Sequence, residues 1–469
     1  MNFSKKTRNI LIIVSAFTLT ACTSVPRDGG IGQVEDIFEQ RLERQVRLPQ
    51  PGKQMPMTVE QVDQLLLQPL TLENAERMSI EANPALKATL AQVGVAEADY
   101  AQAGRMENPG LSYERFSTDD NSASLLFDIG GLFLMPLKRQ LERRRLEAAR
   151  YQAAVDVLSH IGNTRQSWIK AVAEKQQTAL IKRALESVET SNNLIRQMAA
   201  LGHSNVIEAA QSELVLSEMR ATMTRQKLAE GAARETLIRQ LGLWGQQART
   251  LDIPDQLPAL PAEPVNIPAV EQQAIEGRLD VQIAKSNLEG MAKNLSLTQL
   301  SPFFSAFEYG PVREEAEGER ERGYEIELRL PIFDAGGVQN EKARILFDQA
   351  QAQAQATAIS AASASREALA TYQSAWEIAR HMTEETLPIR RRISEEQLLK
   401  YNGMLISVFD LLNDLLSATM MEADYVTAMR DFWLADTNLQ QVLTGAGGSQ
   451  MSFADASSLA GASGGAGEH

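Results

Sequence analysis

Apolar and polar residues alternate strictly in one short stretch of the second half of the chain. From Tyr324 to Leu330 apolar and charged side chains take turns, which is the two-residue period of a half-buried β-strand. The pattern then becomes helical, and the segment from Val338 to Tyr401 contains no Gly and a single Pro, Pro388. At 1.5 Å per residue this helix is about 95 Å long, with a kink expected at Pro388. Such a length predicts an elongated molecule.

The same order of elements occurs in both halves of the chain. An amphipathic helix opens each half, a strand pair follows at about 110–137 or about 303–332, and a long helix comes next. The first long helix is predicted from about Lys138 to Ala200. Pro136 and Pro331 occupy matching positions about 195 residues apart, which is what an internal duplication predicts.

A tight turn, here called a tip, is predicted at the end of each long helix, at 201–208 and at 401–410. A return helix of about 36 residues follows each tip. The opening helix and the return helix together are about as long as the long helix, so two short helices stacked end to end are expected to line it. The first return helix carries the seven-residue repeat of a coiled-coil seam at Ile207, Leu214, Ala221 and Leu228.

These patterns divide the chain into six segments. A Pro-rich equatorial connector separates the repeats, and the Gly-, Ser- and Ala-rich tail is expected to be disordered. The segments are a signal peptide at 1–21, an N-terminal lipid-anchored segment at 22–70, a first repeat at 71–242, the connector at 243–270, a second repeat at 271–445 and the tail at 446–469.

The N-terminus has the pattern of an export signal. Three basic residues precede a short apolar core that ends near Leu19, and the following Thr20, Ala21 and Cys22 complete a junction that resembles a bacterial lipobox. Cys22 is the only cysteine, so it cannot form an intramolecular disulfide, and lipidation is favoured over an incidental thiol. Thr23, in place of the Asp that resembles an inner-membrane retention signal, favours the outer membrane. No other cofactor is expected.

Composition and motifs argue against three classes of protein: nucleic-acid binders, metal-binding proteins and hydrolases with a nucleophile elbow. The net charge of −14 and the lack of a basic patch argue against nucleic-acid binding. The four histidines show no metal-ligand spacing, so no metal site is predicted. The single Gly-x-Ser-x-Gly sequence, at Gly461–Gly465, lies in the tail without the strand and helix that a nucleophile elbow needs.

The alternating strand suits a transmembrane barrel, in which outward-facing and inward-facing residues alternate. Tyr324, Ile326, Leu328 and Leu330 are expected to face lipid, whereas Glu325, Glu327 and Arg329 are expected to face a water-filled lumen. The charged segment 311–322 is expected to be a loop in water. Four strands leave open edges in lipid, so several subunits must pool their strands to close a barrel.

At this point the chain resembles the TolC-like outer-membrane efflux channels, in their lipoprotein branch. The resemblance rests on segments 70–114, 330–344 and 401–445, in order within a duplicated frame. It implies a mainly α fold with transmembrane β, in which a homotrimer forms a twelve-stranded barrel continued by a periplasmic helical tunnel. It further implies an outer-membrane location in a Gram-negative bacterium, contact with outer-membrane lipid, and no chemical step. The partners that it implies are a periplasmic adaptor (membrane fusion) protein and an inner-membrane pump of the RND type.

The resemblance also gives the tips a role as contacts with the adaptor. Turn chemistry alone also explains them, with Gly at positive φ and Asn205 and Ser407 as helix N-caps. Met404 stands where the family usually has Gly. The candidate tip residues are Gly202, His203, Ser204, Asn205, Gly403, Met404, Leu405 and Ser407.

Three polar residues follow the second tip at the start of the return helix: Asp410, Asn413 and Asp414. In the family, side chains here narrow the periplasmic aperture, and three copies would form a ring that attracts cations. The alternative is an acidic first turn that interacts with the helix dipole.

Two other functional classes compete with the channel. One is a lipid-anchored periplasmic coiled-coil spacer or adaptor protein without a membrane-spanning barrel, and the other is a lipoprotein enzyme, which has only the tail motif in its favour. The strand pairs argue for the channel, because a spacer has no use for four amphipathic strands. The sequence does not select a cargo among drugs, metal ions, solvents and peptides.

Overall fold

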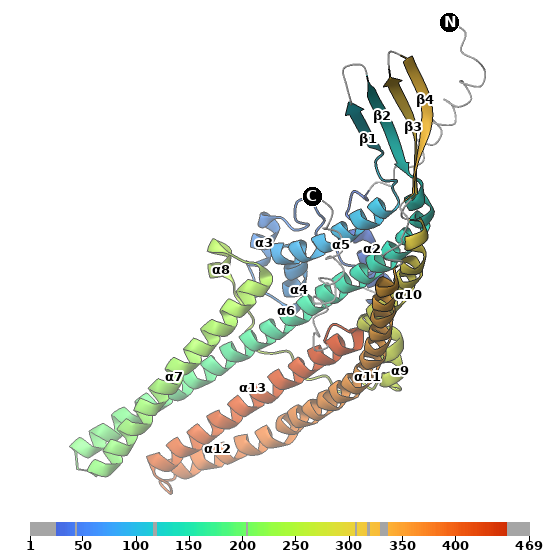
Figure 1. Cartoon of the computed structure of the whole chain (residues 1–469). Helices are drawn as coiled ribbons and strands as arrows, with labels where there is room; N and C mark the ends of the chain where they lie inside the picture. Colours follow the sequence, from blue (N-terminus) through green and yellow to red (C-terminus); the bar gives the residue numbers. More distant parts are fainter. Residues whose placement is uncertain are drawn as a thin grey trace.

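The chain is an elongated helical body with a small β-sheet at one end (Figure 1). The computed structural model describes residues 25–42, 45–115, 120–202, 205–304, 307–316, 319–328 and 336–447. The signal region with Cys22, His203 and Ser204 of the first tip, Arg329, Leu330 and the tail beyond residue 447 lie outside the described residues. None of the helices in these ranges combines the length and apolar character of a membrane span.

The first repeat is built around one long helix, α6, which spans Ile129–Ala200. Its 72 residues make it about 108 Å long. The other elements of this repeat are α4 (Leu72–Glu81), α5 (Pro84–Ala103), β1 (Gly110–Arg115), β2 (Asn121–Asp128) and α7 (Val206–Leu241).

The predicted boundary between the first strand pair and α6 was wrong. The strand ends at Asp128 and not near Leu137, and Pro136 lies inside the helix that was predicted to begin at Lys138. The Asp128 carboxylate accepts a hydrogen bond from the backbone N–H of Gly131 at 2.7 Å, which supplies the N-cap that starts the helix early. A short apolar run fits a strand and a buried helix equally well, so periodicity alone could not separate them here.

The second repeat has the same order of elements. Its strands continue through residues 311–316 and 319–322, which were predicted to form a loop, and α10 continues through Phe304, which was predicted to lie in a strand. High charge disfavours burial but not strand pairing in water, which accounts for the error. The elements are α10 (Leu279–Phe304), β3 (Phe307–Ala316), β4 (Glu319–Leu328), α11 (Gly337–His381), a π-helical turn η1 (Met382–Thr386), α12 (Leu387–Asn402) and α13 (Val408–Thr444).

Near Pro388, where a kink was predicted, the helix contains the π-helical turn η1, which ends two residues before the proline. Proline has no N–H for the carbonyl of residue 384, and its ring crowds that carbonyl. A local π-helical turn relieves this crowding without ending the helix.

The expected end-to-end stacking of short helices is confirmed in both repeats. Each return helix ends in a left-handed glycine, Gly242 with φ 70° and Gly445 with φ 82°. The Asn83 side chain caps α5 and donates a hydrogen bond to the Gln240 carbonyl at 2.8 Å, which joins α5 to the end of α7. Gly445 lies against the first backbone N–H groups of α10, where a side chain would be crowded.

The connector and the described part of the N-terminal segment pack against the middle of the body. The predicted equatorial connector is held by two tryptophans: Trp376 donates to the Pro261 carbonyl at 3.0 Å, and Trp433 donates to the Pro258 carbonyl at 3.1 Å. Buried apolar residues of the N-terminal helix α2 share a core with α5 and α6. These segments contain α2 (Ile31–Leu42), α3 (Val59–Leu65) and α8 (Gly245–Thr250), and α9 (Val270–Gly277) begins where the connector ends.

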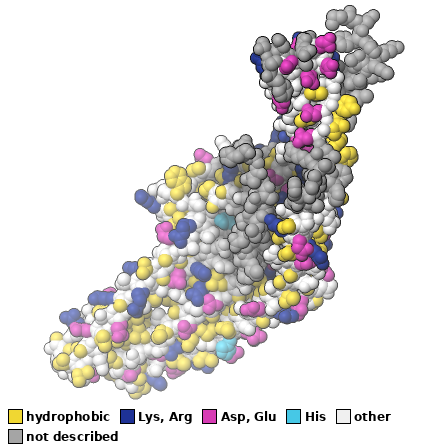
Figure 2. All heavy atoms as spheres, in the orientation of Figure 1, with side chains coloured by type: hydrophobic (Ala, Val, Ile, Leu, Met, Phe, Trp, Pro, Cys, Tyr) yellow, Lys and Arg dark blue, Asp and Glu magenta, His cyan; other side chains and the backbone are white. Residues whose placement is uncertain are grey.

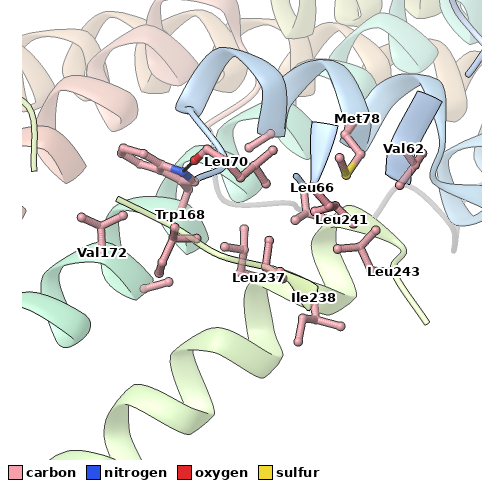
Figure 3. Packing of buried hydrophobic residues seen from close by; sticks show 14 of the residues in the cluster. Val62, Leu66, Leu70, Met78, Trp168, Val172, Leu237, Ile238, Leu241 and Leu243 are labelled. Carbon is pink, nitrogen blue, oxygen red and sulfur yellow. Dashed lines mark hydrogen bonds between the residues drawn. The ribbon is translucent and has the colours of Figure 1, made fainter. Parts of the chain in front are cut away.

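The largest core cluster lies at this equator (Figure 3). Trp168 of α6 is 3% exposed and donates from Nε1 to the Leu70 carbonyl at 2.7 Å. Around it pack apolar side chains of α3, α4, α7 and the connector, among them Val62, Leu66, Met78, Leu237, Leu241 and Leu243.

Candidate functional site

The four strands form one antiparallel sheet in the order β1-β2-β3-β4, so the two repeats join through the β2–β3 pair. Residues opposite each other share a face of the sheet, as do residues two apart along a strand. The register therefore assigns every strand residue to one of two faces.

One face, here called the apolar face, is hydrophobic in the rows nearest the helices. The expected grouping of Tyr324 with Ile326, opposite to Glu325 and Glu327, is confirmed by the register. The Tyr309 and Tyr324 rings are neighbours on this face, with centroids 6.1 Å apart and planes inclined by 34°. The other apolar residues of this face are Leu111, Tyr113, Ala123, Leu125, Phe127, Phe307 and Pro311.

The opposite face, here called the carboxylate face, carries eight acidic residues and no basic residue. In Figure 2 magenta carboxylates gather over the strands. Serine and glycine occupy much of the remaining positions, so this face presents a polar, negatively charged surface. The acidic residues are Glu114, Asp128, Glu308, Glu314, Glu319, Glu321, Glu325 and Glu327.

Both tips lie at the end of the body opposite the sheet, each at the end of its own helical hairpin (Figure 1). In the first, Gly202 has φ 73°, and Asn205 forms a capping box with Glu208. The apolar side chains of Val206 and Ile207 beside it are exposed. The predicted turn chemistry is therefore present at Gly202 and Asn205, the two candidate residues of this tip that the structure describes.

The second tip contains a strained residue. Met404 has φ 56° in the left-handed region, whereas Gly403 before it has φ −79°. The Leu405 N–H bonds to the Lys400 carbonyl at 2.9 Å across the turn, which fixes this geometry. The Met404 side chain is 94% exposed and Leu405 beside it is also exposed, so both present apolar surface at the end of the molecule.

Met404→Gly is expected to stabilise the second tip by about 1 kcal/mol, because glycine adopts the left-handed conformation without the Cβ clash of other residues. Hydrogen exchange at the α12–α13 junction measures the change. Leu405→Gly serves as the control, since residue 405 does not have a positive φ and glycine should bring no gain there. Faster exchange in Met404→Gly than in the wild type would contradict the strain.

The structure separates the three candidate aperture residues. Asp410 is exposed at the start of α13, where its carboxylate accepts hydrogen bonds from Ser407 N–H at 2.9 Å and from Ser407 Oγ at 2.7 Å. Asn413 is exposed one turn later. Asp414 instead is buried and forms an ion pair with Arg390 of α12, which also bonds to the Asp414 carbonyl. Its carboxylate joins α12 to α13 and is not directed to the exposed surface as the aperture role requires.

Arg390 is a residue that the sequence reading did not single out. It lies 24 residues before its partner, on the other helix of the hairpin, so no local spacing marks the pair. A buried, hydrogen-bonded ion pair of this kind fixes the register of two helices, and loss of either partner leaves a buried charge.

Asp410 is held in its ionised form. Hydrogen bonds from the Ser407 side chain, and then from the Ser407 backbone, hold the pKa of this carboxyl below its ordinary value of 3.8. The carboxylate therefore stays charged throughout the physiological pH range. The two interpretations of Asp410, as an acidic residue of the first helical turn and as a residue of the aperture, are compatible, because the cap leaves its side chain exposed.

The stability of this cap is expected to depend on pH only in acid. Since the pKa is lowered on folding, the stabilisation is complete above the unfolded value and disappears as the pH falls through the lowered one. Amide protection in the first turn of α13, measured by hydrogen exchange, should fall in that window. Asp410→Asn should show little pH dependence there, and an equal response in both proteins would refute the linkage.

The fold matches that of solved outer-membrane channels. The CmeC outer membrane channel of Campylobacter jejuni superposes with a TM-score of 0.70 at 16% identity, over 83% of this chain and 88% of that chain. The outer membrane protein VceC of Vibrio cholerae gives 0.65 at 16% identity, over 80% and 97%. The chain has the fold of these channels. The open state of the MtrE outer membrane channel of Neisseria gonorrhoeae gives 0.64 at 15% identity, over 80% and 89%.

These similarities confirm the expected mainly α fold with a four-stranded sheet. No family model matches the sequence, and no curated protein matches it. In the described residues, no group of three or more His, Cys, Asp or Glu side chains is placed to hold a metal ion.

Proposed function

We propose that this protein is the outer-membrane exit channel of a tripartite efflux system. The observation that carries the proposal is the two-faced sheet, which continues directly into helices of duct length. An apolar face suits lipid and a carboxylate face suits water, as the alternation of a transmembrane barrel requires. Conduction through such a duct involves no chemical step in this subunit.

The assembly that we propose is a homotrimer. A single four-stranded sheet has two open edges, which lipid does not tolerate, and three copies supply the strands of a twelve-stranded barrel. The helices support this assembly. The seam residues Ile207, Leu214 and Leu228 of α7 are exposed within one chain, because α7 packs on α6 through another face that includes Ser212 and Met223. The seam is thereby left for a neighbouring subunit.

Imaging of single particles extracted from outer membranes tests the assembly. Hollow, three-fold particles with a detergent belt at one end are expected, and they should conduct ions in planar bilayers. A monomer, or a solid rod without a belt, would overturn the channel and favour the periplasmic spacer.

The tips are proposed to contact a periplasmic adaptor protein, which would connect the duct to an inner-membrane pump of the RND type. The exposed apolar side chains of Val206, Ile207, Met404 and Leu405 support this role, because such residues clustered at one end of a molecule are typical of contact surfaces. A photo-crosslinker at position 405 should yield an adduct whose mass identifies an adaptor. A crosslinker at Val59, which is exposed on α3, is the control and should yield none.

Cys22 is proposed to carry an N-terminal lipid that anchors the mature chain to the outer membrane. The lipobox-like junction supports this modification. Cells labelled with radioactive palmitate should incorporate it into the wild type and not into Cys22→Ser. Equal labelling of both would overturn the anchor while leaving the barrel proposal intact.

A further inference from the structure

The basic residues of the strands all lie on the apolar face, in the two rows farthest from the helices. They are Arg115, Arg313, Arg320 and Arg322, here called the arginine rim. One acidic residue, Glu315, shares these rows and forms an ion pair with Arg320 at 3.0 Å. The rim therefore carries a net positive charge, whereas the charged residues of the opposite face are all acidic.

The position of the rim on the sheet is that of a membrane interface. Successive rows on one face are two residues apart, or about 7 Å along the strand. Arg313 and Arg322 share a row with Tyr113. The next row toward the helices contains Tyr324. Tyrosines mark the level at which hydrocarbon meets headgroups in membrane barrels. The arginines begin at this level, at the end of the strands distant from the helical body.

The arrangement within the rim points to an anion. Arg313 and Arg322 are directly opposite each other in the β3–β4 pair, and both side chains are exposed. Like charges in this cross-strand position destabilise a sheet. The Glu315 carboxylate attracts Arg313 but is already paired with Arg320, so the rim keeps a net positive charge that an anion would offset. All four basic residues are arginine, whose planar guanidinium binds a phosphate through two parallel hydrogen bonds.

We propose that the arginine rim binds the phosphate groups of anionic lipids in the outer leaflet of the membrane. This inference rests on the proposed function, since it requires the apolar face to contact lipid. The occupant is a lipid and not a free anion, because the rim continues the surface that the bilayer covers. Each chain would hold lipid phosphates around the outer circumference of the barrel and so fix its height in the membrane.

The test uses the full-length trimer in micelles that contain a phosphorylated disaccharide lipid, its dephosphorylated form, or phosphatidylethanolamine. Lipid retained per trimer after gel filtration is counted by native mass spectrometry. The wild type should retain the phosphorylated lipid several-fold better than the other two, and the preference should weaken at high salt. Equal retention of the phosphorylated and dephosphorylated lipids would overturn the proposal.

Variants then separate the rim from the general charge of the sheet. Arg313→Gln with Arg322→Gln should lose most of the preference for the phosphorylated lipid. Glu314→Gln with Glu321→Gln changes the neighbouring positions of the same strands, on the carboxylate face, and should keep the preference. Arg313→Lys with Arg322→Lys keeps the charge without the paired hydrogen bonds and should retain an intermediate amount. Unchanged retention in the Gln pair would refute the assignment to these arginines.

Two further measurements separate the possible failures. Inorganic phosphate added at millimolar concentration should leave the bound lipid in place, and its release would identify a simple anion site instead. Conductance of the same trimers reports on the barrel itself. Trimers that conduct but show no lipid preference would overturn this inference alone, whereas the absence of a conducting trimer would overturn the proposed function.

Discussion

A channel that carries Glu308→Gln, Glu325→Gln and Glu327→Gln is expected to lose most of its preference for cations over anions. These carboxylates lie on the carboxylate face in the two rows nearest the helices, and three chains would contribute nine of them to the lumen of the proposed trimer. A ring of like charges within low-dielectric walls concentrates counter-ions and excludes ions of its own sign. Neutral glutamine keeps the size and polarity of the side chain and removes its charge, which weakens the field most in these two rows.

The reversal potential in a planar bilayer under a salt gradient measures this selectivity. The wild type should show a clear cation preference that shrinks as salt rises, because the Debye length falls from about 10 Å at 0.1 M to about 3 Å at 1 M. Glu315→Gln is the matched control, since this carboxylate lies on the apolar face of the same strand. Selectivity that is unchanged in the triple variant, or that falls equally in the control, would show that the carboxylate face does not line the lumen.

The repeat, the long helices and the alternation of β4 could all be predicted from the sequence. Each is a periodic signal that extends over many residues or occurs twice, so errors at single positions do not remove it. The left-handed glycines at 242 and 445 end the return helices where they were expected to end. Local periodicity also sufficed to separate the two faces of β4, because side chains alternate strictly along a strand.

What could not be predicted depends on contacts between distant residues. Asp414 appeared equivalent to Asp410 by position, yet it is buried in an ion pair with Arg390 of the preceding helix. The sequence alone also does not show that all charged residues of the carboxylate face are acidic. Glu308, for example, is assigned to this face only by its pairing with Glu327. The helix boundary at Asp128 depended on one cap in a run that also fits a strand.

Truncation of Trp168 is expected to weaken the equator, where α6 and α7 pack against the N-terminal segment and the connector. Its indole packs among the side chains of the largest core cluster, and its N–H satisfies the buried Leu70 carbonyl. Trp→Ala in such a site costs about 3–5 kcal/mol through lost contacts and the cavity that remains. The damage should be local, because elongated structures open in separate cooperative units.

Hydrogen exchange resolves this local opening better than a melting temperature, since a long body of packed helices need not unfold in two states. Amides of α6 and α7 around the cluster should lose most of their protection in Trp168→Ala, while those of the strands should be unchanged. Trp168→Phe keeps much of the bulk and lacks the N–H, so it should lose about 1–3 kcal/mol for the unsatisfied carbonyl. Protection that is lost equally at the tips and at the equator would mean that the body unfolds as one unit. A Phe variant as weak as Ala would instead place most of the stabilisation in the single hydrogen bond to Leu70.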